Sequence, residues 1–440
     1  MKQYIDFFVS ERHKIDESCA PLLNSFREKA FETFRQTGFP VYQSEDFRHT
    51  DVGNLLKDDL GFYLNLWNTG INPHKVFFCN VPNLNAYKYF VVNGHFFQET
   101  GKELPSGVYL GSLNVFAERY PDLFSRYYNQ QASQAGDGLS AFNTMFVQDG
   151  FVLYVPENVV LEKPVQLTDI SGGNVDSLTN RRILIILEQG AQAKLLICDH
   201  TNDDKVTFAA TQVAEIYTGE NASFDYYELE ESNWNTVRLA NSFVQQAASS
   251  SVIANNITLS NGFTRNNYQI DLTGQQAETH LHGLAIADAQ QTVDNYTLIN
   301  HQASGCRSNE LFKYLLDDEA TGVFNGKIVV SPDAQKTEAY QSNRNLLGNR
   351  RCRMYSQPKL EINADDVKCS HGMTTGQLDE TALFYMRSRG IPKEEAVLML
   401  KYAFTGDVLK GIRLEGLRDR LKLLIEKRLR GELIKCQECI

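Results

Sequence analysis

The segment Asp365-Asp366-Val367-Lys368-Cys369-Ser370-His371-Gly372 contains the residue types best suited to chemistry. In an extended strand, residues two apart share a face, so Cys369 and His371 are expected to point the same way and Lys368 the other. A thiolate and an imidazole are suitable ligands for iron, zinc or copper. Two ligands cannot hold a metal alone, so a partner surface would have to supply the rest. A buried thiol beside a hydrogen-bonded histidine is the alternative, and the spacing leaves both interpretations open.

Two further pairs of candidate ligands occur elsewhere in the chain. His280-Leu281-His282 also places two imidazoles on one strand face, and a ladder of histidines on a repetitive fold would explain it without a metal. Cys436-Gln437-Glu438-Cys439 is a lone CxxC motif, and no second motif completes a four-thiolate site. We interpret it as a mobile tail with incidental thiols.

Motifs of nucleotide and hydrolytic enzymes are missing from the sequence. Neither Gly-Lys pair is followed by Ser or Thr, so there is no phosphate-binding loop. A G-x-S-x-G elbow and an H-E-x-x-H helix are also absent. The chain is therefore not expected to hydrolyse ATP by itself.

Composition restricts the classes of partner and the compartment. Acidic residues outnumber basic ones, 54 to 43, and a net charge of -11 repels phosphate backbones, so nucleic acid is not an expected partner. No apolar run approaches the roughly 20 residues that span a bilayer. The first residues lack the layout of a secretory signal, and the eight cysteines are scattered, which favours a reducing cytoplasm.

Residues 150–375, which include the Cys369 and His371 segment, contain short strands and no convincing helix. Polar turns with a small residue separate these strands and mostly recur at intervals of about 26 to 31 residues, which indicates stacked β-coils. A β-sandwich with long loops is the alternative. A sandwich of this length would need one very large core, whereas a solenoid extends its core by adding coils, so we favour the solenoid. The turns include Gly190-Ala191, Gly219 to Ala222, Ala247-Ala248, Gly274 to Ala277, Ala303-Ser304, Ala334 and Asn363-Ala364.

Two regions flank the predicted solenoid. Residues 1–149 are expected to form a helical and mixed α/β region, with one helix over residues 21–34, a hairpin at Asn93-Gly94, and a connection over Gln130 to Gly138. Residues 376–440 are expected to form helices. Asp379 and Glu380 suit the start of the first, and Gly390 suits the position just after its end.

A run of linked motifs occupies the later part of the chain: Asp333-Ala334-Gln335-Lys336-Thr337, Gln341 to Leu347, Pro358 to Ile362, Asp365 to Gly372 and Leu383 to Ile391. With this run, the chain resembles the SufB/SufD family of iron–sulfur cluster assembly proteins, and within it the SufD branch. The N-terminal motif Glu45 to Asp51 and the segment Gly150 to Pro156 resemble the family more loosely.

The resemblance implies a right-handed parallel β-helix flanked by an N-terminal α/β region and a C-terminal helical region. It implies a non-catalytic scaffold that pairs with a SufB-like paralogue through the β-helix and with a SufC-like ATPase through the C-terminal helices, with homodimers possible when isolated. No cofactor is expected to be permanently bound. His371, with Cys369 beside it, matches the histidine at which a transient iron–sulfur cluster or iron would be shared with the paralogue. Residues in the matching ATPase-docking helices are Leu383, Phe384, Tyr385, Arg389, Leu400 and Phe404.

Two other functions are weighed against the scaffold. A β-helix carbohydrate lyase or hydrolase would need carboxylates grouped on one face of adjacent coils, and no such grouping stands out in the sequence. A homodimeric interaction protein without a metal role is the second alternative.

Overall fold

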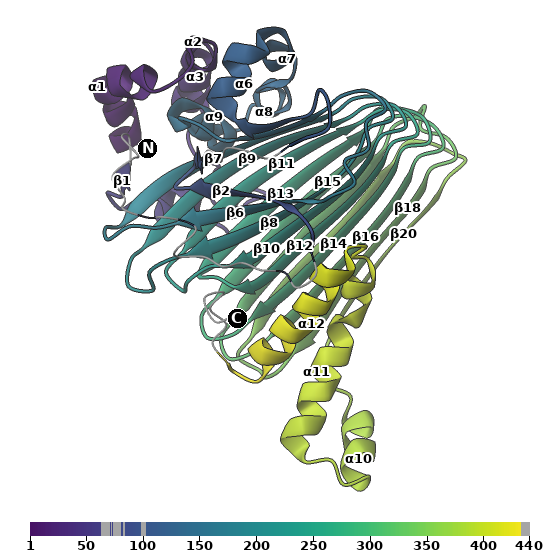
Figure 1. Ribbon diagram of the computed structural model, residues 1–440. Helices are drawn as coiled ribbons and strands as arrows, with labels where there is room; N and C mark the ends of the chain where they lie inside the picture. Colours follow the sequence, from purple (N-terminus) through teal and green to yellow (C-terminus); the bar gives the residue numbers. More distant parts are fainter. Residues whose placement is uncertain (63–70, 72, 74–80, 82–83, 98–102, 433–440) are drawn as a thin grey trace.

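The protein is a mainly β structure dominated by a parallel β-solenoid of about eight turns (Figure 1). The computed structural model describes residues 1–62, 71, 73, 81, 84–97 and 103–432. Both flanking regions expected from the sequence, an N-terminal α/β region and C-terminal helices, are present. The strands of the solenoid are β5 (Phe151–Val155), β6 (Val165–Ser171), β7 (Ser177–Leu187), β8 (Gln192–Thr201), β9 (Phe208–Thr218), β10 (Ser223–Glu231), β11 (Val237–Gln246), β12 (Ser251–Ser260), β13 (Phe263–Leu272), β14 (Glu278–Ala287), β15 (Thr292–His301), β16 (Arg307–Leu316), β17 (Thr321–Val330), β18 (Glu338–Leu347), β19 (Arg353–Ile362) and β20 (Lys368–Gly376).

Consecutive strands alternate between two sheets. From β5 onward, the odd-numbered strands form sheet A and the even-numbered strands form sheet B. Neighbours within a sheet are parallel and in register, for example Val237 opposite Phe263 and Thr321 opposite Arg353. Each side chain therefore lies directly above the equivalent side chain of the preceding coil.

The turns predicted from small residues all lie at one corner of the solenoid, between an odd-numbered strand and the next even-numbered one. Ala191, Ala222 and Ala277 are buried there against the core. The residue two positions before the even strand is left-handed in most coils, as at Gly190 and Gly305. Glycine suits this conformation because it has no Cβ. At the other coils the left-handed residue is Asn221, Ser249, Gln276 or Lys336, so the same turn recurs with different residues.

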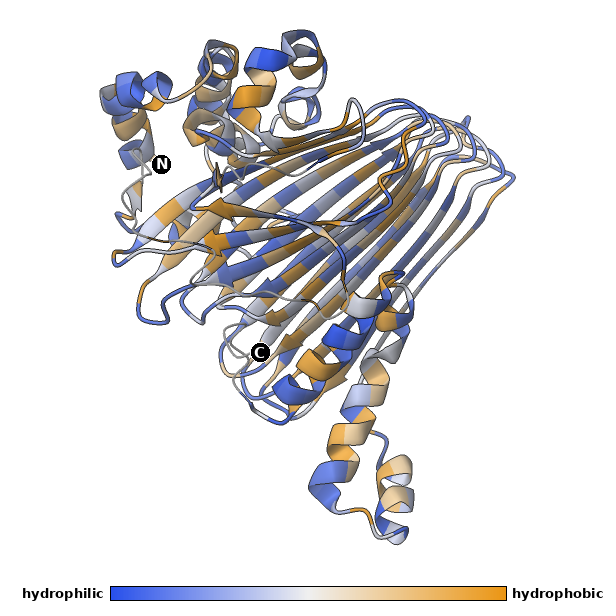
Figure 2. Ribbon diagram, in the orientation of Figure 1, coloured by the Kyte–Doolittle hydropathy of each residue, from blue (hydrophilic) through white to orange (hydrophobic). Residues whose placement is uncertain are grey.

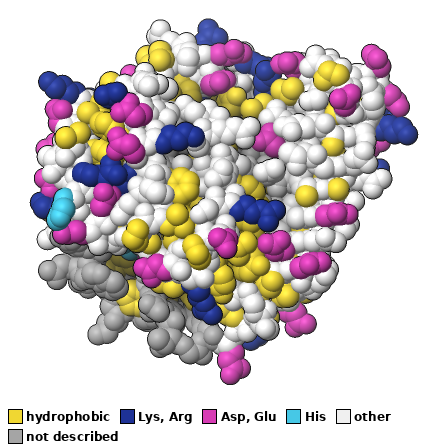
Figure 3. Space-filling view, turned by 90° about the horizontal axis from the view of Figure 1, so that it is seen from above, with side chains coloured by type: hydrophobic (Ala, Val, Ile, Leu, Met, Phe, Trp, Pro, Cys, Tyr) yellow, Lys and Arg dark blue, Asp and Glu magenta, His cyan; other side chains and the backbone are white. Residues whose placement is uncertain are grey.

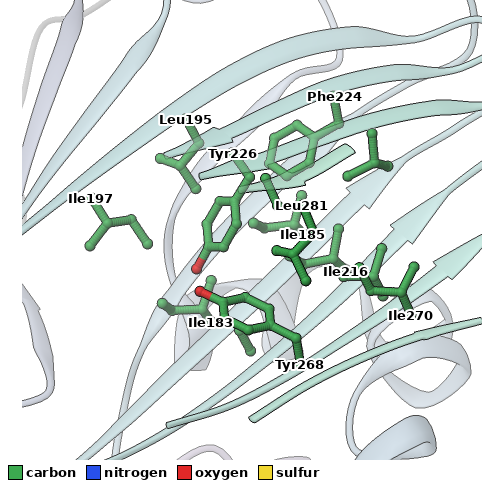
Figure 4. Close-up of a cluster of buried hydrophobic side chains, with 14 of the residues drawn as sticks. Ile183, Ile185, Leu195, Ile197, Ile216, Phe224, Tyr226, Tyr268, Ile270 and Leu281 are labelled. Carbon is green, nitrogen blue, oxygen red and sulfur yellow. The ribbon is translucent and has the colours of Figure 1, made fainter. Parts of the chain in front are cut away.

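The apolar core lies between the two sheets. Strand residues facing inward alternate with residues facing outward, which bands the strands by hydropathy in Figure 2. Ile183 and Ile185 of β7, Leu195 of β8 and Ile216 of β9 pack together in this core (Figure 4). Each added coil extends this core instead of thickening it.

The N-terminal region covers the outer face of sheet A and also adds strands to both sheets. β2 pairs with β6 in sheet B, and β4 pairs with β5 in sheet A. Aromatic residues of the helices pack onto outward-facing residues of sheet A such as Leu178 and Leu239. Its elements are α1 (Lys2–Glu17), α2 (Pro21–Asn24), α3 (Arg27–Thr37), α4 (Val52–Leu55), β1 (Gly61–Phe62), β2 (Tyr87–Val92), β3 (His95–Phe97), β4 (Tyr109–Ser112), α6 (Leu113–Arg119), α7 (Pro121–Tyr127), α8 (Gln130–Ala135) and α9 (Gly138–Phe146).

Two local expectations for this region are corrected. The helix expected over residues 21–34 is divided into α2 and α3, and the expected connection after Gln130 contains helix α8. Glu215 on sheet A explains the second difference, because its buried carboxylate accepts hydrogen bonds from the backbone N–H groups of Asn129 and Gln131 at the start of α8. Arg182 pairs with Glu215 at 2.7 Å, and both side chains are fully buried. The expected Asn93-Gly94 hairpin is confirmed.

Three helices follow the solenoid: α10 (Glu380–Ser388), α11 (Lys393–Lys410) and α12 (Glu415–Leu429). The Asp379 carboxylate caps α10 by accepting from the N–H groups of Thr381 and Ala382, as expected, and Gly390 follows α10 with a φ of 87°. Among the described helices, none combines the length and apolar composition that a membrane crossing requires. On the face seen from above, acidic and basic side chains are interspersed (Figure 3).

Candidate functional site

The last coil of the solenoid has an open edge. β19 is the end strand of sheet A and β20 the end strand of sheet B, so each pairs with one neighbour only. Most residues of β20 are exposed, in contrast to the buried strands of the coils before it. Within the described residues nothing covers this end, and the outer N–H and C=O groups of both strands are available for pairing.

Cys369 and His371 lie on β20 and share a face, as the spacing predicted. Cys369 is in register with Ala339 and His371 with Gln341, whose side chains both face the buried interior. Cys369 is half-buried and packs against the end of the core, whereas His371 is exposed at the open end. Lys368 lies on the other face and pairs with Glu338 at 3.2 Å.

The two side chains differ in their availability to a metal. Burial raises the pKa of the Cys369 thiol, which keeps it protonated at neutral pH. A neutral imidazole such as that of His371 can bind a metal through a ring nitrogen without first losing a proton. The described residues contain no group of three or more His, Cys, Asp or Glu side chains arranged to hold a metal ion. Among these residues, His371 therefore offers an exposed imidazole but not a complete metal site.

The C-terminal helices divide into a projecting part and a fastened part. α10 and the first half of α11 extend away from the solenoid (Figure 1). After its charged first turn, this half of α11 is mostly hydrophobic (Figure 2). Phe384 is 74% exposed and Tyr385 57% exposed, with the guanidinium of Arg389 over the Tyr385 ring. Leu383 is instead buried between the helices, and Leu400 is half-buried.

The fastened part joins α12 and the end of α11 to the outer face of sheet B. Phe404 packs against this junction. Arg428 on α12 forms a bidentate ion pair with Asp288 and also donates to the Leu259 carbonyl at 2.7 Å. These contacts attach the C-terminal helices to the solenoid. The apolar junction contains Leu196, Leu229, Ile257 and Leu284 from the sheet and Val408, Leu409, Leu417, Leu421 and Ile425 from the helices.

Comparison with known proteins identifies the family. A profile described as "SUF system FeS cluster assembly, SufBD core domain" matches residues 170–404, and a "SufBD protein N-terminal region" profile matches residues 1–167. This chain belongs to the SufBD family. It is 27% identical to an iron–sulfur cluster assembly SufBD family protein of Synechocystis, over 92% of this chain and 91% of that protein. Two proteins named SufD are also similar: that of Escherichia coli, 31% identical over 61% of this chain and 64% of its own length, and that of Bacillus subtilis, 27% identical over 74% of each.

In this SufBD protein, the N-terminal motif Glu45 to Asp51 forms a strap across the outer face of sheet A. Thr50 donates to the buried carboxylate of Asp294, which also pairs with Arg265 at 2.6 Å. The residue next to Thr50, His49, stacks on the exposed Tyr355 of β19, with 3.9 Å between ring centres. A cavity of about 460 Å³ lies between the strap and strands β15, β17 and β19. The motif thus ties the N-terminal region to the last coil.

The remaining candidate pairs of this SufBD protein lie away from the open end. His280 and His282 share the outer face of β14, with 6.1 Å between ring centres, and His280 contacts Glu278 at 2.9 Å. Burial beside the loop after α11 lowers the pKa of His282 to about 4. Cys436 and Cys439 lie outside the described residues.

Sequence reasoning missed an ion network inside the solenoid. Arg181 lies 3.2 Å from Asp169 and 2.5 Å from Asp199, and Arg238 joins Asp199 to Glu228. Although burial opposes its ionisation, the two guanidinium groups lower the pKa of Asp199. The available signal was a charged residue at the inward position of a strand that is otherwise apolar on that face, such as Arg181 two residues before Ile183.

Proposed function

We propose that this chain is the SufD-like, non-catalytic scaffold subunit of an iron–sulfur cluster assembly complex. It pairs with a SufB-like paralogue through the open end of the solenoid and with a SufC-like ATPase through α10 and α11. The nascent cluster, which is cargo and not a resident cofactor, forms at the subunit interface beside His371. The exposed imidazole on an uncovered last coil is the observation that carries this proposal.

The open edge supports the pairing with a paralogue. Edge strands recruit further strands, because unpaired backbone groups gain hydrogen bonds when another chain adds to the sheet. β19 and β20 present two such edges side by side, one for each sheet. A second solenoid with a matching end could continue both sheets across the interface, and its side chains would supply the ligands that His371 lacks.

The projecting helices support the docking of an ATPase. Phe384 and Tyr385 form an exposed aromatic pair, and aromatic residues of this kind are common at the centres of interfaces. The chain has no phosphate-binding loop of its own, so nucleotide chemistry has to come from a partner. Motion of that partner would reach the solenoid through the junction with sheet B.

The central experiment is co-expression with SufB-like and SufC-like homologues under anaerobic conditions, followed by iron and sulfide analysis of the complex. His371→Ala is expected to leave complex formation intact and to reduce the cluster content severely. Ser370→Ala, on the opposite face of the same strand, is the matched control and should behave as wild type. Normal cluster content in the His371→Ala complex would refute the role of this residue.

ATPase docking is tested separately. Phe384→Asp changes an exposed side chain on the projecting part and is expected to abolish co-purification of the ATPase. Leu423→Asp is the control, because Leu423 is an exposed apolar residue, 45% accessible, on the fastened helix α12. Equal ATPase recovery with both variants would contradict docking at α10.

The open end also predicts the behaviour of the isolated subunit. Without the paralogue, two copies are expected to pair through the same strands. Lys368 donates its backbone N–H to the Thr337 carbonyl of the preceding coil, so alternation along β20 turns the N–H of Met373 toward the open edge. Met373→Pro removes that donor and should shift the population to monomers in sedimentation analysis. Depolymerisation of acidic polysaccharides by the purified chain would instead support a carbohydrate enzyme.

A further inference from the structure

A column of three polar side chains runs from the interior of the solenoid to its open end. Glu310 on β16 is in register with Gln341 on β18, and Gln341 is in register with His371 on β20. All three occupy inward-facing positions of successive coils. Side chains in these coils contact one another from coil to coil, since Asn345 on β18 donates to Thr375 on β20 at 3.0 Å.

Gln341 has one satisfied and one unsatisfied end. Its Nε2 donates to the Glu310 carboxylate at 2.7 Å, while its Oε1 is buried without a hydrogen-bond partner among the described residues. Glu310 is fully buried and Gln341 is 3% exposed. An unpaired buried carbonyl costs about 1–3 kcal/mol, so a donor is expected close to it. The next side chain toward the open end is the imidazole of His371, which carries an N–H in either neutral tautomer.

We infer that Gln341, held by Glu310, is a positioning residue for His371. The amide carbonyl accepts the N–H of one ring nitrogen, which selects one tautomer and leaves the lone pair of the other nitrogen for a ligand. Histidines that bind metals usually have such an outer partner, which orients the ring. The assignment to cluster assembly rests on the proposed function, but the hydrogen bond itself does not.

The test measures the tautomer of His371 in the full-length chain by NMR of protein labelled with 15N in the histidine rings. His371→Gln identifies the signals of His371 among those of the nine histidines. Measurements are made at pH 8, where Glu310 is mostly ionised, because burial raises its pKa to about 7. One predominant tautomer is expected in the wild-type chain, and a mixture of two would overturn the inference without any variant.

Variants at Gln341 then separate positioning from packing. Gln341→Met keeps the length of the side chain but has no amide carbonyl, and it should produce a mixture of tautomers. Gln341→Glu keeps an acceptor; with one proton held between its carboxyl group and that of Glu310, it should restore one tautomer. Ser342→Ala, on the same strand but the outward face, is the control and should match the wild type. An unchanged tautomer in Gln341→Met would contradict the inference.

Cluster analysis of the complex distinguishes the two proposals. Gln341→Met is expected to lower cluster content roughly tenfold, the lower end of what loss of such an outer partner costs a metal site. If His371→Ala assembles clusters normally while Gln341→Met changes the tautomer, the proposed function fails and the positioning role stands. If His371→Ala abolishes assembly but the tautomer does not depend on Gln341, only the positioning role fails.

Discussion

Lys313, on the outer face of β16, fastens the middle of α11 to sheet B. Its Nζ donates to the Phe404 carbonyl and to the Asp407 carboxylate, each at 2.8 Å, and lies 4.7 Å from the centre of the Phe404 ring. The Lys313 side chain is only 3% exposed. Asp407 also pairs with Lys410 at 3.3 Å, but the Lys410 side chain is 80% exposed. Two lysines therefore share one carboxylate and differ in burial.

Lys313→Met is predicted to weaken the docking of α11 by about 2–5 kcal/mol. The substitution removes two charge-assisted hydrogen bonds, each contributing about 1.5–3 kcal/mol. The apolar methionine recovers part of this, about 1 kcal/mol, by remaining against the junction. Lys410→Met removes an exposed ion pair with the same Asp407 and should cost less than about 1 kcal/mol.

Native-state hydrogen exchange of the full-length chain measures this difference directly. The amides of α11 between Lys401 and Lys410 should exchange through a lower opening free energy in Lys313→Met, while the strands of the solenoid keep their protection. If Lys313→Met costs no more than Lys410→Met, the buried lysine does not anchor the helix and the apolar junction alone holds it.

Acid should reproduce part of the effect of Lys313→Met. The hydrogen bond from Lys313 is the main cause that lowers the pKa of Asp407. A carboxylate with a lowered pKa contributes its stabilisation above the unfolded value of about 3.9 and loses it as the pH falls through the folded value. Protection of α11 in the wild type should therefore fall below about pH 4, and this acid-dependent loss should be smaller in Lys313→Met.

Three further predictions concern stability. Glu215→Ala should cost about 3–5 kcal/mol of stability, because it leaves Arg182 charged and buried without its carboxylate partner. Denaturant unfolding measures this cost, and a loss below about 1 kcal/mol would contradict it. Gly94→Ala should lower the thermal unfolding midpoint more than Gly390→Ala does. Both glycines have positive φ, but of the two only Gly94 would bring a Cβ against a backbone atom, at 2.7 Å. Equal midpoints would count against this reasoning. Glu310→Gln should become more stable relative to the wild type as the pH rises from about 4.5 to about 7. Over that window the raised pKa of Glu310 makes its ionisation oppose folding of the wild type. Parallel pH profiles of the two proteins in denaturant unfolding would show that Glu310 does not titrate there.

Features that depend on residues close together in the chain could be predicted from the sequence. The recurring turns with small residues locate one corner of the solenoid in each coil, because turn conformation depends on a few adjacent residues. The same holds for the start of α10 at Asp379 and for its end before Gly390. The shared face of Cys369 and His371 follows from the alternation of side chains along a single strand.

Features that depend on distant contacts were decided by the tertiary structure. Helix α8 forms where the sequence suggested a connection, because Glu215, from a strand far along the chain, accepts hydrogen bonds from its first amides. The strap motif reaches the last coil through a contact between Glu45 and Lys359 at 2.5 Å. Local pattern carries no information about such pairs.

The amino-acid sequence alone therefore determined the repeating coil, the flanking helices and the two candidate ligands on one strand. Only the tertiary structure decided that no described segment covers the last coil, that His371 is exposed there above Gln341, and that α12 and the end of α11 pack on sheet B. The physical reason is that a strand's own residues specify its alternation and its turns, whereas exposure depends on which other segments cover it.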